Sequence, residues 1–220
     1  MGRPGGANLG AFSPRRPMRR RLLPLRPLAL RPLHLCGLVF ALAACASHSG
    51  PPCESCGGPG GKRGGARLTS TLRMPAVTGE ALVVTGVVTR RGRPAPGVYI
   101  YAYQTDVAGR YTPSPGATGL DARHGRLRGW LRTGPDGGYR IETIRPAAYP
   151  RFPDPAHIHL TVRPPGEAER WIDDVVFADD PRLTSAWLAR QEGRGGPGLT
   201  RPHRSADGVW HARRDIALDR

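Results

Sequence analysis

Apolar and polar residues alternate along much of the chain after residue 80, and a period of two residues predicts β-strands. In VYIYAYQ, residues 98–104, Val98, Ile100 and Ala102 occupy one face of such a strand and three tyrosines occupy the other. Similar patterns predict strands in ALVVTGVVTR, YRIETI, AHIHLTV, WIDDVVFA and GVWHARRDIAL. Turn residues separate these segments, and SAWLARQ fits one or two turns of helix. We therefore expect an all-β fold, a β-sandwich with long loops on one side.

Residues 1–76 lack this alternation and divide into two segments. Residues 1–44 hold eight arginines and no acidic residue, and they end in an uncharged apolar run, LCGLVFALAA. Such a run is typical of a signal peptide and is too short to span a bilayer. Met18, which opens MRRRLLPLRPL, is a more usual start than Met1. Residues 45–76 are rich in Gly and Pro, which predicts a flexible tether, so the folded domain is expected to cover residues 77–220.

The cysteines concern the same N-terminal region. LAAC, residues 42–45, resembles the lipobox of bacterial lipoproteins, which implies a lipid on Cys45, a membrane partner and a place in the bacterial cell envelope. The alternative is a cysteine at the end of an ordinary signal peptide. Cys53 and Cys56 form CESC, a spacing that suits a redox pair or half a zinc site in a cytosolic protein. In an exported protein we expect a local disulfide between them.

The net charge changes once the N-terminal segment is set aside. The whole chain carries a formal charge of +16. Without residues 1–44, 25 basic residues remain against 17 acidic ones, which lowers the net charge to about +8. Nearly all of the basic residues are arginines, and they are scattered instead of forming a basic arm. We therefore expect no nucleic-acid partner.

The stretch AAYPRFPDPAHIHLTV, residues 147–162, carries the clearest chemical pattern. On a strand, His157 and His159 point to the same side, about 7 Å apart. Such a pair either binds a metal ion or is a half-exposed strand face. Tyr149 indicates which ion would suit the pair, because a phenol with a pKa of about 10 ionises at neutral pH only beside a strong positive charge. Fe(III) supplies that charge and prefers anionic oxygen, so we expect a second tyrosine on a loop.

Four segments resemble, in order and spacing, the intradiol ring-cleavage dioxygenases of the protocatechuate and catechol type. These segments are PAPGVYIYAYQTDVAGRY, RTGPDGGYRIETIRPAAYP, PAHIHLTV and FADDP. The resemblance implies a β-sandwich and a non-haem Fe(III) held by Tyr111, Tyr149, His157 and His159. It also implies that a catechol-type diol displaces Tyr149 from the iron, which makes this residue both ligand and catalytic base. In that family O2 then opens the ring between the two hydroxyls and a muconic acid-type product results.

One position departs from the family pattern. Members usually carry an arginine just before the Pro-Ala-His run, where it faces the substrate, and here that position is Asp154. An aspartate would repel a carboxylated substrate. The candidate replacement cations, each with a solvated surface position as the alternative, are Arg126, Arg128, Arg132 and Arg151.

The resemblance therefore implies an oxidoreductase that binds Fe(III), O2 and a small aromatic diol, and the expected signal peptide implies that it is exported. The alternative is a metal-dependent catechol- or iron-binding surface lipoprotein without turnover, and the oligomeric state is left open. A further cluster of acids is interpreted as a solvated turn at a strand end instead of a cation site; these are Asp173, Asp174, Asp179 and Asp180.

Overall fold

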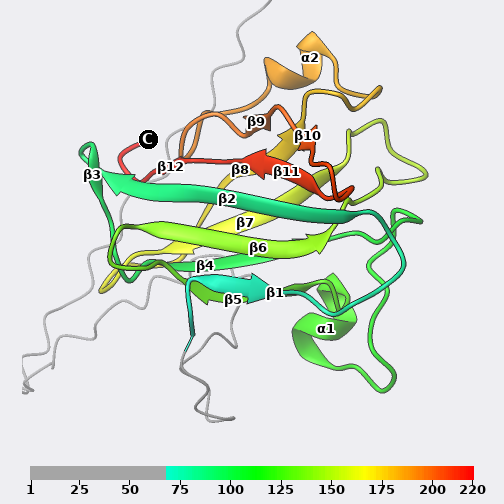
Figure 1. Cartoon of the computed structure of the whole chain (residues 1–220), viewed down its shortest axis with the longest axis horizontal. Helices are drawn as coiled ribbons and strands as arrows, with labels where there is room; N and C mark the ends of the chain where they lie inside the picture. The colour runs from blue at the N-terminus through cyan, green and yellow to red at the C-terminus, as the bar shows by residue number, and fades with distance from the viewer. Residues whose placement is uncertain (1–67) are drawn as a thin grey trace, which may run out of the picture. The chain divides into compact units, whose positions relative to one another are not determined.

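The computed structural model describes residues 68–220, which form two β-sheets packed face to face (Figure 1). The first sheet contains β1 (Thr71–Arg73), β2 (Ala81–Arg90), β3 (Arg93–Pro94), β6 (Gly138–Ile144), β10 (His203–Arg204), β11 (Trp210–Arg213) and β12 (Ile216–Ala217). The second sheet has the order β5 (Arg128–Arg132), β4 (Tyr99–Gln104), β7 (His157–Arg163), β8 (Arg170–Phe177) and β9 (Leu199–Thr200). Two short helices, α1 (Gly119–His124) and α2 (Ser185–Leu188), lie in the loops. The predicted all-β sandwich is confirmed.

The core lies between the sheets and fixes which side of β7 faces outward. Ile158, Leu160 and Val162 are fully buried in this core, as the period of two residues predicts. Burial of each such side chain contributes roughly 1.5–3 kcal/mol. A slip of one residue would turn all three out of the core, so their burial also holds His157 and His159 on the opposite face.

The folded part begins earlier than the expected residue 77, because β1 starts at Thr71 and pairs in parallel with β6. Leu72 is buried in the core and packs where Gly129 leaves room on β5. Three residues are too few to show a period, and the boundary was therefore placed too late. The expected signal peptide, most of the expected tether, and Cys45, Cys53 and Cys56 lie outside the described residues.

Two further strands differ from the expectation. The segment GVWHARRDIAL forms β11 and β12 instead of one strand, because Arg214 between them is buried and donates hydrogen bonds to the carbonyls of Gly195 and Asp215. The segment RGWLR forms β5 and pairs with β4, although its arginines hid the strand pattern. Among residues 68–220, no helix has the length and apolar character needed to cross a membrane.

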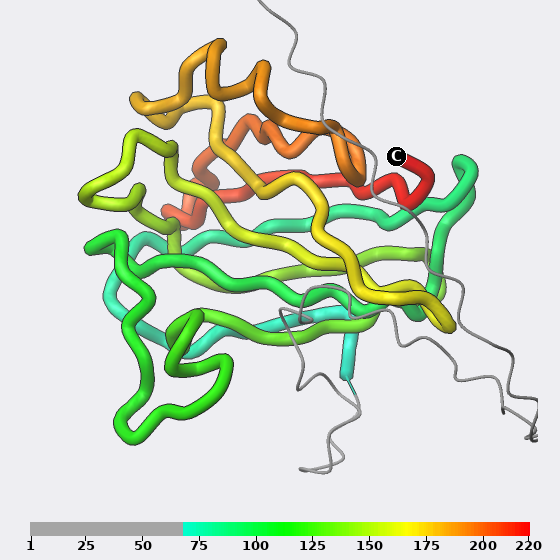
Figure 2. Tube along the Cα trace, turned by 180° about the vertical axis from the view of Figure 1, so that it is seen from behind, coloured from blue at the N-terminus to red at the C-terminus, as the bar shows by residue number. Residues whose placement is uncertain are grey.

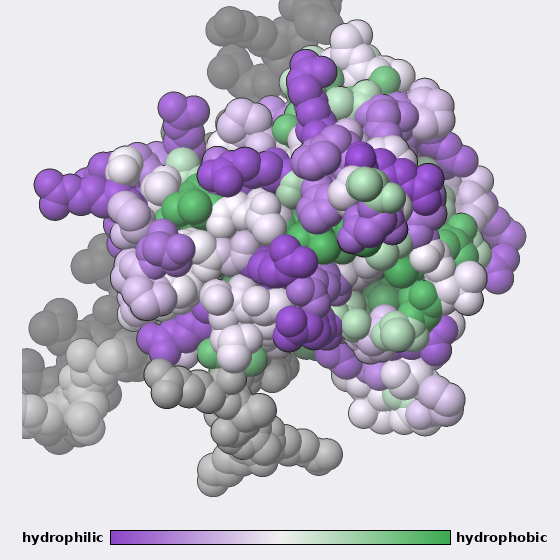
Figure 3. Space-filling model, viewed as in Figure 1, coloured by the Kyte–Doolittle hydropathy of each residue, from purple (hydrophilic) through white to green (hydrophobic). Residues whose placement is uncertain are grey.

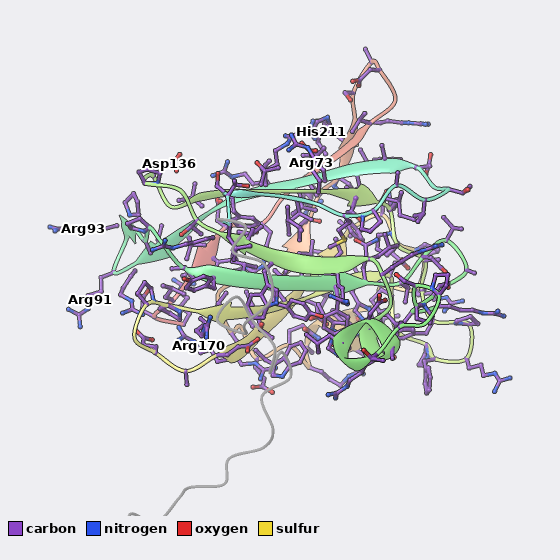
Figure 4. The ribbon with its side chains drawn as sticks, turned by 90° about the horizontal axis from the view of Figure 1, so that it is seen from below. Arg73, Arg91, Arg93, Asp136, Arg170 and His211 are labelled. Atoms are coloured by element: carbon purple, nitrogen blue, oxygen red, sulfur yellow. The ribbon has the colours of Figure 1, made fainter. Side chains whose placement is uncertain are left out.

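Three long connections leave the strands at one end of the sandwich, on the left in Figure 2, and the third then runs back toward the C-terminus. They cover residues 105–127, 145–156 and 178–198. Arg91, on the turn between β2 and β3, and Arg93, the first residue of β3, lie at the other end and project away from it (Figure 4). Hydrophilic side chains are scattered over the face in Figure 3 between smaller apolar areas. The three connections supply the loop residues of the site described next.

Candidate metal centre

Strand β7 presents His157 and His159 on its outer face, with their Nε2 atoms 3.1 Å apart. The ring centroids are 4.5 Å apart and the rings are nearly perpendicular. They are closer than the 7 Å expected from strand geometry, because the two side chains turn toward each other. His157 is buried and His159 is half-buried. The strand therefore directs two ring nitrogens at one point.

Hydrogen bonds to the other ring nitrogens fix the tautomers. His157 Nδ1 lies 2.7 Å from the carbonyl oxygen of Pro155, which can only accept, so Nδ1 donates. His159 Nδ1 lies 3.1 Å from Asp174 Oδ1 and donates to that carboxylate. Burial, and then the neighbouring His159, lower the pKa of His157 and favour its neutral form. With Nδ1 as the donor in both residues, it is Nε2 that each ring directs at the shared point.

A β-bulge brings Asp174 to His159. The register of β7 and β8 shifts between Ile158 and Leu160, so that two acids of β8 lie opposite His159. Asp174 turns to His159 Nδ1, whereas Asp173 is 4% exposed and accepts a hydrogen bond from Gly193 N. The interpretation of these two acids as a solvated turn was wrong.

The other two acids of that cluster support the loop before β7. Asp180 Oδ2 accepts a hydrogen bond from Ala156 N, and its Oδ1 accepts one from Arg182 N. Asp179 is exposed and pairs with Arg145 at 2.5 Å. The signal that could have revealed them is their place at the end of β8, next to the His-x-His strand.

Tyr111 follows a turn that Asp106 organises. The Asp106 carboxylate accepts hydrogen bonds from Ala108 N at 2.8 Å, Arg110 N at 3.2 Å and Thr112 Oγ1 at 2.5 Å. Gly109 has a φ of +69°, and a side chain there would overlap the carbonyl oxygen of Ala148. The turn before Tyr111 therefore packs directly on the segment that carries Tyr149.

Tyr149 lies in the middle of the four rings. Its Oη is 3.0 Å from His159 Nε2 and 3.2 Å from His157 Nε2, and it makes a short hydrogen bond with Tyr111 Oη. Arg182 holds the Tyr149 backbone, because its Nη1 donates to the Tyr149 carbonyl oxygen at 2.6 Å. Burial raises the pKa of both phenols, and the hydrogen bond with Tyr149 raises the pKa of Tyr111 further. Without a nearby cation, both phenols are therefore protonated at neutral pH.

An aromatic stack supports His159 from behind. The Tyr103 ring stacks on His159 at 4.5 Å between centroids and on His124 at 3.9 Å. His124 is buried, and its Nδ1 lies 2.9 Å from the hydroxyl of Tyr101. Tyr101 and Tyr103 come from the tyrosine face that period two predicts for β4. Their contact with His124, across a loop, could not be predicted from the local pattern.

The donor set fits a ferric ion. Tyr149 Oη carries one proton and can donate it to only one of the two Nε2 atoms. Without a cation, the lone pair on the other Nε2 therefore receives no hydrogen bond from Tyr149. Ligand atoms bound at about 2 Å to one ion lie about 3 Å from each other, which is the spacing seen among three of these atoms. Two phenols that need a positive charge to ionise suit Fe(III) in particular. Asp174 contacts His159 Nδ1, on the far side of the ring, and orients the ring instead of joining the four donors.

The structure places the four candidate arginines on two connections and at the two ends of β5. Arg132 lies at the far end of β5, packs over Tyr99 and donates to the carbonyl oxygen of Gly97. Arg128 lies 3.8 Å from a carboxylate oxygen of Asp121. Arg126 is half-buried before β5, and Arg151 is exposed in the loop that follows Tyr149. Arg126, Arg128 and Arg151 thus lie in the loops or at the strand end near the site, whereas Arg132 does not.

The fold and the site together define a class of protein, an all-β sandwich that carries a candidate metal centre of four side-chain rings. The chain belongs to the dioxygenase family, because the family model described as Dioxygenase matches residues 64–193. The resemblance to the intradiol dioxygenases is confirmed at the level of the family.

Two curated relatives share part of this sequence. The 6-chlorohydroxyquinol 1,2-dioxygenase of Cupriavidus pinatubonensis is 30% identical over 144 residues, which cover 52% of this chain and 50% of the relative. The protocatechuate 3,4-dioxygenase beta chain of Burkholderia cepacia is 32% identical over 117 residues, which cover 48% of each chain. This chain therefore spans about half the length of the curated relatives it matches.

Solved structures support the same fold. The dioxygenase domain of a dioxygenase carbohydrate-binding protein fusion from Streptomyces sp. SirexAA-E is 28% identical, with a TM-score of 0.53 over 69% of this chain and 87% of that chain. The hydroxyquinol 1,2-dioxygenase of Pseudomonas putida DLL-E4 is 22% identical, with a TM-score of 0.51 over 72% of this chain and 64% of that chain. The second likeness concerns the fold alone.

Proposed function

We propose that this chain is a non-haem Fe(III) intradiol dioxygenase that opens catechol-type rings with O2 between the two hydroxyls and releases a muconic acid-type product. The observation that carries the proposal is the meeting of four side-chain donor atoms, which are Tyr111 Oη, Tyr149 Oη, His157 Nε2 and His159 Nε2. These side chains would hold the iron, which when bound acts as a Lewis acid on the diol and makes its ring reactive toward O2.

Tyr149 has a second role in this proposal. Burial raises the pKa of its phenol, and Asp174 and Asp154 raise it further, although the hydrogen bond from Tyr111 acts in the opposite direction. A Tyr149 phenolate released from a cation is therefore a strong base. Its Oη would accept the proton of a substrate hydroxyl, while Tyr111, His157 and His159 keep their places.

Iron content, colour and oxygen uptake test the proposal together. Purified protein should hold about one iron per chain, show a visible phenolate-to-iron absorption and consume O2 with catechol. Tyr111→Phe and His159→Ala should lose the colour. Tyr99→Phe is the matched control, because Tyr99 lies at the other end of β4 between Arg132 and Arg163 and should keep both colour and turnover. A colourless protein that cannot be reconstituted with iron would contradict the proposal.

A binding protein without turnover is the second candidate, and Asp154 favours it. The position that carries an arginine in the family pattern is here an acid tied to Trp187, so a cation that would hold the substrate's developing charge is missing from it. A binding protein would change its visible spectrum on addition of catechol and consume no O2. Oxygen uptake therefore separates the two candidates.

We also propose that the chain is exported and anchored by a lipid on Cys45 in the bacterial cell envelope, with Cys53 and Cys56 joined in a local disulfide. The apolar run before LAAC supports this proposal. Cys45→Ser should move the protein from the membrane fraction to the soluble fraction of a bacterial host. Thiol labelling of the purified wild type should find Cys53 and Cys56 unreactive until a reductant is added.

A further inference from the structure

A turn of exposed residues follows Tyr149, the residue in the middle of the four rings. Pro150, Arg151, Phe152 and Pro153 are all exposed, and Phe152 is exposed to 62%. Proline has no N–H group to donate. Within residues 68–220, no backbone N–H donates to the Tyr149 carbonyl oxygen. The turn therefore has neither buried side chains nor a backbone hydrogen bond at its first residue to hold Tyr149 in place.

Arg182, on the connection that follows β8, supplies the missing donor. Its Nη1 atom donates to the Tyr149 carbonyl oxygen at 2.6 Å and to the Phe152 carbonyl oxygen at 3.1 Å. Hydrogen bonds from a charged donor are about twice as strong as those between neutral groups. One guanidinium group thus joins the two ends of the turn.

The backbone of Arg182 is tied to the end of the same loop. The Asp180 carboxylate accepts a hydrogen bond from Arg182 N at 2.8 Å through Oδ1, and one from Ala156 N at 2.9 Å through Oδ2. Ala156 directly precedes His157, the first residue of β7. These contacts therefore fix the Tyr149 backbone relative to the strand that carries both histidines.

The proposed function requires the Tyr149 phenol to leave the metal centre, accept a substrate proton and return. Catalytic groups work when they are held within about 0.5 Å of the productive geometry. We propose that Arg182 is a positioning residue that holds the Tyr149 backbone during this exchange. The phenol then moves by rotation of its side chain, while the loop stays closed. This inference rests on the proposed dioxygenase function.

Arg182→Ala tests the inference through kcat per bound iron. This value should fall roughly tenfold to 100-fold, because a small misplacement of a reacting group has an effect of this size. A loss of folded protein would lower the iron content and leave kcat per bound iron unchanged, so the measurement separates positioning from stability. Arg182→Lys should recover part of the loss, because its ammonium group can still donate to carbonyl oxygens.

Arg190→Ala is the matched control for this change. Arg190 is an exposed arginine on the same connection, and none of the hydrogen bonds and ion pairs of residues 68–220 involves its side chain. The variant should keep the wild-type kcat per bound iron. A loss equal to that of Arg182→Ala would show that removal of any positive charge from this connection has the effect, and it would overturn the inference.

A double-mutant cycle with Tyr149→Phe tests whether Arg182 acts through the phenol. Phenylalanine cannot accept the substrate proton, so the position of its backbone no longer affects this transfer. Arg182→Ala should therefore lower kcat per bound iron by less than about twofold in the Tyr149→Phe protein. Product chromatography follows the slow residual turnover of these variants. The same loss in both backgrounds would mean that Arg182 acts elsewhere and would overturn the inference.

Tryptic cleavage of the iron-free chain provides a readout that needs no metal. The bond between Arg151 and Phe152 lies in the turn that Arg182 holds, and it is cut when this segment opens locally. In Arg182→Ala, cleavage at this bond should become roughly tenfold faster or more, relative to cleavage after Arg91 on the turn between β2 and β3. Arg190→Ala should keep the wild-type ratio. An unchanged ratio in Arg182→Ala overturns the inference.

Failure of this inference can be distinguished from failure of the proposed function. A wild-type protein that holds iron and turns over catechol, together with Arg182→Ala at the same kcat per bound iron, overturns the inference alone. A wild-type protein that neither binds iron nor consumes O2 with any diol overturns the proposed function and the inference together.

Discussion

The carboxylate of Asp154 accepts a hydrogen bond from the indole nitrogen of Trp187, with 3.1 Å between Oδ1 and Nε1. Trp187 is buried on α2, and Asp154 is half-buried in the loop that leads to His157. The bond joins this loop to α2, and Arg182 holds the same loop through the Tyr149 carbonyl. A negative charge is thereby fixed close to the candidate metal centre.

Asp154→Asn should change the choice of substrate. The amide oxygen of asparagine can still accept from Trp187, but the charge that repels a carboxylated diol is removed. We expect kcat/KM for 3,4-dihydroxybenzoate, relative to 3,4-dihydroxybenzyl alcohol, to rise by about tenfold, which corresponds to about 1.4 kcal/mol. Steady-state oxygen uptake measures kcat/KM for both substrates. In the wild type, added salt should reduce the difference between the two values.

Asp179→Asn is the control for that prediction, because Asp179 is an exposed acid paired with Arg145. In this variant, the ratio of kcat/KM for 3,4-dihydroxybenzoate to kcat/KM for 3,4-dihydroxybenzyl alcohol should stay at the wild-type value. A ratio that does not change in Asp154→Asn would show that the charge at this position has no part in selection.

Replacement of Asp174 should weaken metal binding in a graded manner. Asp174 accepts from His159 Nδ1 and so orients the Nε2 lone pair. Loss of such a partner typically costs about 10-fold to 100-fold in metal affinity. Asp174→Ala should show the full loss, while Asp174→Asn, which keeps an accepting oxygen, should lie between it and the wild type. Competition for iron with a chelator, monitored through the visible absorption band, gives the order of the three iron affinities. Equal affinities for the wild type and both variants would show that Asp174 does not orient His159 for metal binding.

Gly109→Ala should separate Tyr111 from Tyr149. A methyl group at Gly109 would overlap the Ala148 carbonyl oxygen, and the φ of +69° is unfavourable for alanine. Gly116→Ala is the matched control, since its φ is +70° and no atom lies within 4 Å of the added carbon. Both variants lose roughly 1–2 kcal/mol through the backbone. Only Gly109→Ala should lose more stability than that, as measured by thermal or denaturant unfolding, and only this variant should also lose iron. Equal losses of stability in the two variants would contradict the packing of Gly109 on Ala148.

The predictable part of the site is the part that local geometry determines. Period two places His157 and His159 on one face, and the chemistry of a phenol beside them indicates a trivalent ion. Tyr111 required the resemblance to a family, because its distance from Tyr149 depends on how the Gly109 turn packs on another loop. Asp174 was missed because the bulge that turns it to His159 arises only when β7 and β8 pair. The same limit applies to β1 and β5, whose strand character comes from pairing with β6 and β4.

The turn before Tyr111 should respond to acid through Asp106. Burial acts to raise the pKa of Asp106, but hydrogen bonds from Thr112, Ala108 N and Arg110 N outweigh it, and the pKa is lowered. A lowered folded-state pKa means that the stabilisation is present above the unfolded value of about 3.9 and is lost as pH falls through the folded value. The visible band, which would report on Tyr111, should therefore weaken below about pH 4.

Asp106→Asn isolates this contribution from protonation of the other groups. The variant should be less stable than the wild type at pH 7, because the amide is a weaker acceptor for Thr112 and the two backbone N–H groups. Its stability should then fall less than that of the wild type between pH 5 and pH 2, since no carboxylate remains at this position to be protonated. Asp136→Asn, in the turn before β6, tests whether any turn aspartate has this effect, and its visible band should follow the wild-type acid profile. Parallel acid profiles for Asp106→Asn and the wild type would mean that the ionised carboxylate does not hold the Tyr111 turn.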